Sequence, residues 1–119
     1  DFPLDQAAFD AATLAHCAGA DRYHGFLQVL FREKEAWAHA KDYLPVLSRF
    51  GQVGGISAEQ FAACRGSKTS TDQILKMAVD GRQAFKVNAT PTFFIADKMH
   101  VGVIEFDQFA KIVDPLLPR

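Results

Sequence analysis

The chain has 119 residues, of which 49% are hydrophobic and 23% charged, with 13 Lys and Arg against 14 Asp and Glu. This length is enough for one domain with an apolar core and short for two. The net charge of -1 argues against a nucleic-acid surface or a polybasic membrane patch. No apolar run reaches the roughly 18 residues that predict a membrane-spanning helix.

The first residues resemble neither a signal peptide nor a natural start. Asp1 replaces an initiator Met, and no basic segment or apolar segment follows it. We therefore expect a processed or truncated product from which any export signal has gone.

Apolar residues recur at helical spacing through the first half of the chain. The spacing predicts a helix over about residues 4–18 and a third helix opened by Asp42 and Pro45. Between them, Asp21 is expected to cap a second helix. The predicted buried stripe of this second helix consists of Tyr23, Phe26, Leu27, Leu30 and Phe31.

Two Ser-x-x-Gln patterns predict capping boxes, in which side chain and backbone satisfy each other at a helix start. The pattern at residues 57–60 precedes a short helix that carries Cys64. The pattern at residues 70–73 precedes a longer helix. The chain is thus expected to be helical up to residue 86.

The pattern changes after Val87, where β-rich segments at residues 92–95 and 99–103 flank a turn at 96–98. A β-hairpin is predicted, followed by an amphipathic helix from Phe106 to about Pro115. Three consecutive apolar residues at 93–95 indicate a strand buried on both faces of a larger sheet. The other strands of such a sheet are not in this sequence.

The two cysteines, Cys17 and Cys64, lie far apart in the sequence. This separation excludes a local Cys-x-x-Cys redox motif and a cysteine-rich zinc site. From the residues alone, a disulfide and two buried free thiols remain open.

The segment VNATPTFFI at residues 87–95 resembles the cis-proline strand of DsbA-like proteins of the thioredoxin superfamily. Residues 1–4 resemble the segment after that family's second core strand, residues 26–37 a helix of its inserted helical domain, and residues 106–117 its closing helix. The resemblance implies a partial thioredoxin-like fold of α+β or α/β class. A single domain over 1–119 would combine a helical insertion (1–86) with a C-terminal β-β-α half (87–119).

The resemblance also implies which residues carry function. The catalytic Cys-x-x-Cys would belong to a preceding N-terminal third, so no catalytic residue is expected in this chain, and Cys17 cannot inherit that role. Thr90 and Pro91 correspond to the substrate-binding cis-proline loop, where a cis bond turns backbone groups toward an extended substrate. Cys17 and Cys64 correspond to a structural disulfide found in some relatives.

Other candidate ligand-binding residues give weaker signals. The four histidines, His16, His24, His39 and His100, lack the spacing of a metal site, and no metal or cofactor is expected. Trp37 together with the second helix's aromatic residues could line a peptide groove. Such a stripe is more often core, which is the interpretation we favour.

These observations favour a fragment of an exported, periplasmic bacterial thiol:disulfide oxidoreductase that acts on extended polypeptides. The alternative is a redox-inactive peptide-binding or assembly module. The chain alone is expected to be inactive because it lacks the dithiol. The unpaired strand edge should be covered, either in a homodimer or by a retained N-terminal fragment.

Overall fold

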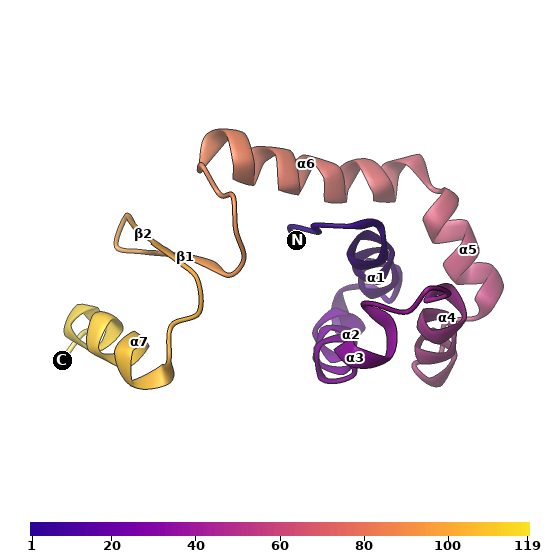
Figure 1. The fold of residues 1–119 in the computed structure, drawn as a ribbon, viewed down its shortest axis with the longest axis horizontal. Helices are drawn as coiled ribbons and strands as arrows, with labels where there is room; N and C mark the ends of the chain where they lie inside the picture. Colours follow the sequence, from indigo (N-terminus) through magenta and orange to yellow (C-terminus); the bar gives the residue numbers. More distant parts are fainter. The chain divides into compact units, whose positions relative to one another are not determined.

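The computed structural model describes residues 1–119 and contains seven α-helices, one two-stranded antiparallel sheet and a final 3-10 helix (Figure 1). The chain forms two compact units, Asp1–Val79 and Asp80–Arg119. The boundary between them falls inside helix α6 (Lys68–Ala84). The change from helices to strands follows this helix, which agrees with the change in sequence pattern after Val87.

The helical unit is built around α1 (Gln6–Cys17), which packs against α2 (Ala20–Arg32), α4 (Leu44–Val53) and α5 (Ala58–Gly66). Alanines on α1 allow these helices to approach closely. The short helix α3 (Lys34–Trp37) packs against α4. The buried cluster of this unit consists of Ala7, Ala11, Leu14, Ala15, Ala18, Phe26, Leu30, Trp37, Leu47, Ile56 and Phe61.

The predicted core role of the aromatic stripe is confirmed for most of its members. Phe26, Leu30 and Trp37 are buried, and Trp37 Nε1 donates a hydrogen bond to the carbonyl of Leu30 at 2.9 Å. The prediction was wrong for Phe31, which is 74% exposed on the outer side of α2. Helical spacing places Phe31 at the margin of the stripe, and no neighbouring helix covers that margin.

The predicted capping box of α5 is confirmed. Ser57 Oγ accepts from the backbone N–H of Gln60 at 3.1 Å, and the Gln60 side chain accepts from the Ser57 N–H at 2.8 Å. These bonds satisfy two backbone groups that the helix start would otherwise leave without partners.

Two other predicted helix starts were wrong. Gly19 stands at the N-cap of α2, so Asp21 lies in the first turn and makes no capping bond. Helix α6 begins at Lys68, ahead of Ser70, and the Ser70 N–H donates to Ser67 Oγ at 3.4 Å. In both cases the helix begins up to one turn before the predicted start, because an earlier residue serves as its N-terminal boundary.

The second unit consists of strands β1 (Thr92–Ile95) and β2 (Lys98–Val101), helix α7 (Phe106–Val113) and the 3-10 helix η1 (Asp114–Leu116). Phe93 pairs with His100 across the hairpin, and the rings of Phe93 and Phe109 lie 5.7 Å apart. Side chains alternate between the faces of a strand, so His100 shares the face that α7 covers. The expected helix-rich fold with a hairpin and closing helix is confirmed.

The opposite face of the hairpin is apolar and open to solvent. Phe94 and Met99 pair on this face and are 48% and 47% exposed, and Val101 is 53% exposed. Phe85 lies beside them, with its ring 5.8 Å from that of Phe94. Strand β1 therefore has one partner strand in the chain, and its other edge is unpaired.

The hairpin turn consists of two residues with positive φ, Ala96 at 48° and Asp97 at 64°. This geometry belongs to the type I′ turn, which favours Asn followed by Gly. The double substitution Ala96→Asn and Asp97→Gly is expected to stabilise the hairpin by about 1 kcal/mol. Hydrogen exchange of the β1 and β2 amides should slow accordingly, whereas Asp97→Ala should accelerate it. Unchanged exchange in the double variant would contradict this geometry.

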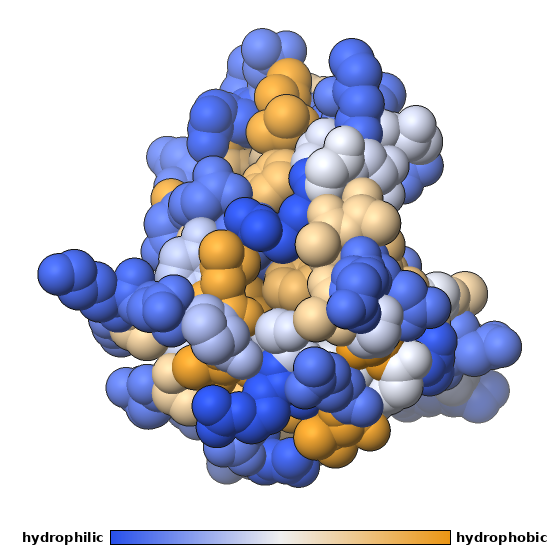
Figure 2. Space-filling view, turned by 90° about the vertical axis from the view of Figure 1, so that its right-hand side faces the viewer, coloured by the Kyte–Doolittle hydropathy of each residue, from blue (hydrophilic) through white to orange (hydrophobic).

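None of the helices is both long enough and apolar enough to cross a lipid bilayer. On the side that bears α4 and α5, hydrophilic side chains surround small groups of apolar ones (Figure 2).

Candidate substrate-binding loop and the cysteine pair

The loop that leads from α6 into β1 is fixed at its start by the backbone. Lys86 has a positive φ of 58°, and the N–H of Val87 donates back to the carbonyl of Gly81 at 2.9 Å. Such a bond closes the end of a helix and satisfies one of its last carbonyls. The loop therefore leaves α6 in a defined direction.

The end of the loop is fixed as well. The Thr92 hydroxyl donates to the carbonyl of Ala89 at 2.6 Å, and the N–H of Gly102 donates to the carbonyl of Pro91 at 2.8 Å. The Thr90–Pro91 peptide bond is cis in the structure. Thr90 and Pro91 are both exposed.

The backbone of Thr90 lies between the two fixed ends of this loop. Neither its N–H nor its C=O takes part in a hydrogen bond within the chain. An exposed backbone N–H and C=O on a fixed segment can pair with an extended peptide, as a further strand would. The two predicted substrate-binding residues thus lie together beside the first strand.

The structure contains the Cys17–Cys64 disulfide that the resemblance implies. The two Cα atoms are 6.0 Å apart, and the bond joins the last turn of α1 to α5. The chain has no free cysteine. Because a thiolate is the attacking species in disulfide exchange, the chain in this state holds no group that could begin that reaction.

His16 precedes Cys17 but has partners of its own. Its Nε2 pairs with the carboxylate of Asp1, and its ring lies 4.8 Å from that of Tyr23. Tyr23 also donates to Asp1 at 3.1 Å. The four histidines belong to no cluster of three or more potential metal ligands.

A buried polar cluster in the helical unit was not singled out from the sequence. Asp10 on α1 is only 3% exposed and accepts from Tyr43 Oη at 2.7 Å and from Arg65 Nε at 3.1 Å. The hydrogen bond to Asp10, together with burial, raises the pKa of Tyr43 to about 12. The sequence did offer one signal, an acidic residue on the alanine-rich face of a helix. A carboxylate buried there requires polar partners, so the position predicts a buried polar cluster.

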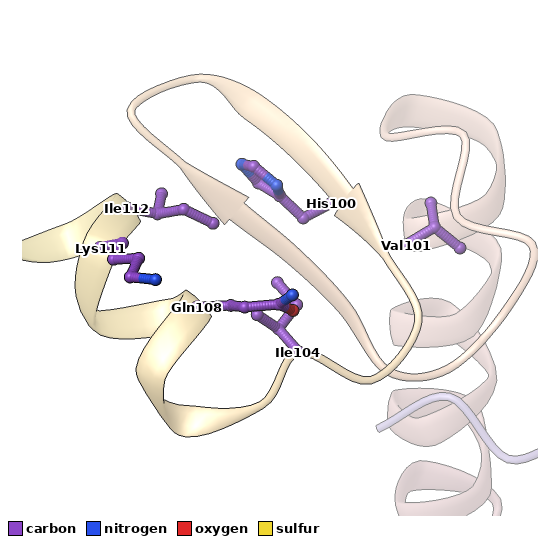
Figure 3. A pocket seen from close by; sticks show the side chains of 6 residues that line it. All are labelled: His100, Val101, Ile104, Gln108, Lys111 and Ile112. Atoms are coloured by element: carbon purple, nitrogen blue, oxygen red, sulfur yellow. The ribbon is translucent and has the colours of Figure 1, made fainter.

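The sequence also did not single out the environment of His100. Its Nε2 is buried and has no hydrogen-bond partner. An open cavity of about 400 Å³ adjoins the ring between β2 and α7 (Figure 3). The strand register could have placed His100 on the face of the hairpin that α7 covers. It could not have shown that a cavity adjoins the ring.

Comparison with known proteins shows the family. The thioredoxin family model matches residues 1–115, so the chain belongs to the thioredoxin family. Three curated relatives carry the name "Putative protein-disulfide oxidoreductase" and match over 98% of this chain. Their identities are 28% for Rickettsia typhi, 27% for Rickettsia felis and 28% for Rickettsia prowazekii.

The chain spans less than half the length of these relatives, namely 43%, 42% and 43% in the same order. No solved structure matches the chain.

Proposed function

We propose that this chain is the substrate-binding and structural part of an exported, DsbA-like protein-disulfide oxidoreductase. The unpaired backbone of Thr90, exposed on a loop fixed at both ends, carries this proposal. The names of the relatives support the reaction class. In this proposal the catalytic dithiol belongs to another part of the whole protein, which fits the bond that joins the two cysteines of this chain to each other.

In this proposal the loop positions the polypeptide and the dithiol performs the exchange. A substrate segment pairs with the N–H and C=O of Thr90, which brings its disulfide or thiols to one place. Pro91 next to it has no N–H and no reactive side chain to compete for the sulfur atoms. The Cys17–Cys64 bond serves structure, and periplasmic export is consistent with it because disulfides persist in oxidising compartments.

The open apolar face of the hairpin fits a protein that is completed by further structure. Phe94, Met99 and Val101 are about half exposed, so full burial would stabilise each by about 1 kcal/mol, roughly half the value for a fully exposed side chain. The unpaired edge of β1 offers a template for another strand. We propose that an N-terminal segment of the whole protein, or a second copy of the chain, covers this surface.

The chain alone is expected to give no turnover in a peptide oxidation or disulfide reduction assay, and titration before reduction should find no thiol.

In the whole protein, Thr90→Pro removes the backbone donor and should raise the KM for a peptide substrate about tenfold. Thr90→Val is the matched control, because it keeps the N–H and the side-chain shape, and its KM should not change.

Equal KM values for these two variants would contradict the role of the loop. Turnover by the chain alone, abolished by Cys17→Ser, would contradict the placement of the dithiol. A whole protein that binds peptides through Thr90 but lacks redox activity would instead be a redox-inactive peptide-binding module.

A further inference from the structure

The cavity between β2 and α7 lies wholly within the second unit. Ile104 and two β2 residues line it from the hairpin side, and three residues line it from α7. Figure 3 shows the α7 side chains extending toward the strand that carries His100, and the His100 ring extending toward α7. The lining residues are His100, Val101, Ile104, Gln108, Lys111 and Ile112.

The polar groups of this cavity suit an anion. His100 Nε2 is buried without a partner, and Lys111 makes no ion pair in the structure. Gln108 can donate from its amide. No acidic residue lines the cavity. A buried polar atom without a partner is costly, so a ligand that supplies an acceptor would gain from meeting it.

The remaining lining residues restrict the ligand further. Ile104 and Ile112 present aliphatic surface around the polar groups. This combination suits a carboxylate on a short methylene stem, as in a glutamate side chain: the stem packs on the aliphatic residues and the carboxylate meets the donors.

The cavity also begins close to the proposed substrate-binding loop. Val101 pairs with Thr92, the residue after Pro91, and Gly102 is bonded to the carbonyl of Pro91. His100 is paired one residue further along β1, with Phe93. An extended peptide advances about 3.3 Å per residue. A side chain a few residues along a peptide bound at Thr90 can therefore reach the cavity.

We propose that this cavity binds the carboxylate of a glutamate side chain in the polypeptide ligand, and so sets a preference for acidic sequences. The proposal rests on the proposed function, because it takes the ligand held at Thr90 to be a polypeptide. Lys111 and Gln108 donate to the carboxylate from α7, and the His100 ring turns its Nε2 toward it on binding.

Binding of pentapeptides to the chain, followed by NMR, tests this preference without any redox reaction. Capped alanine peptides with one Glu or one Gln at the second, third or fourth position differ only in the charged group. In the best position, the Glu peptide is expected to bind about five- to tenfold more tightly than the Gln peptide. The largest amide shifts should lie at residues 100–112.

Lys111→Met should reduce the ratio of the two affinities to below about twofold, because Lys111 is exposed and its loss does not disturb the packing. Lys98→Met is the control: it removes the same charge from the neighbouring hairpin, outside the cavity. His100→Gln provides a second variant on the strand side and should weaken the preference as well.

Equal affinities for the Glu and Gln peptides would overturn the proposal and leave the role of Thr90 standing. A Glu preference that Thr90→Pro does not affect would support the cavity and contradict the loop. Glutarate that binds as tightly as the best peptide would also overturn the proposal, because the cavity would then serve a free organic acid.

Discussion

Breaking the Cys17–Cys64 bond is expected to lower the free energy of unfolding of the helical unit by about 4 kcal/mol. The bond joins residues 47 apart, and its removal restores the conformational entropy of that loop to the unfolded chain. Trp37 is the chain's single tryptophan and is buried in this unit, so its fluorescence reports on the unit directly. Urea titrations with and without reductant measure the difference.

The variant with Cys17→Ser and Cys64→Ser provides the control for this experiment. It should unfold at the urea concentration at which the reduced chain unfolds, and reductant should not shift it further. An oxidised and a reduced chain with the same midpoint would mean that packing between α1 and α5 holds the unit together without the bond.

The second large effect is expected from Asp10→Ala, which should destabilise the helical unit by about 2–3 kcal/mol. The change removes the carboxylate that accepts from Tyr43 and Arg65, and it leaves both donors without this partner. Urea unfolding followed by Trp37 fluorescence again gives the free energy.

Glu35→Ala is the matched control, because Glu35 is an exposed carboxylate and its loss should change stability by less than about 0.5 kcal/mol. Asp10→Asn should fall between the two, since an amide can still accept from Tyr43 but carries no charge for Arg65. A change of less than about 1 kcal/mol in Asp10→Ala would show that water replaces the lost contacts.

The order of elements was predictable because local patterns determine it. The Ser57 box, the buried stripe around Phe26 and the hairpin at 92–101 each depend on residues a few positions apart. The start predicted at Asp21 was misplaced because Gly19, which has no side chain to signal a cap, stands at the N-cap. The start predicted at Ser70 was misplaced because Ser67, three residues earlier, accepts the bond that Ser70 was expected to supply. Exposure of Phe31 depends on which helices lie nearby, and spacing does not specify this.

The candidate sites also divide into those that depend on residues close together in the sequence and those that depend on packing between distant segments. Thr90 and Pro91 are adjacent in sequence, so a motif sufficed to find them. The pairing of Cys17 with Cys64 came from the resemblance, since the spacing alone left free thiols open. Asp10 and its partners come from three separate segments, and no short pattern records that they meet.

The two units also differ in how far along the chain their contacts reach. In the hairpin the pairing extends no further than from Thr92 to Val101, and hairpins form in about 1–10 μs. Disulfides take seconds to hours to form. The strands should therefore be paired long before Cys17 and Cys64 are oxidised, and early helix association must depend on apolar contacts around Leu14. Oxidation then stabilises a packing of α1 against α5 that has already formed.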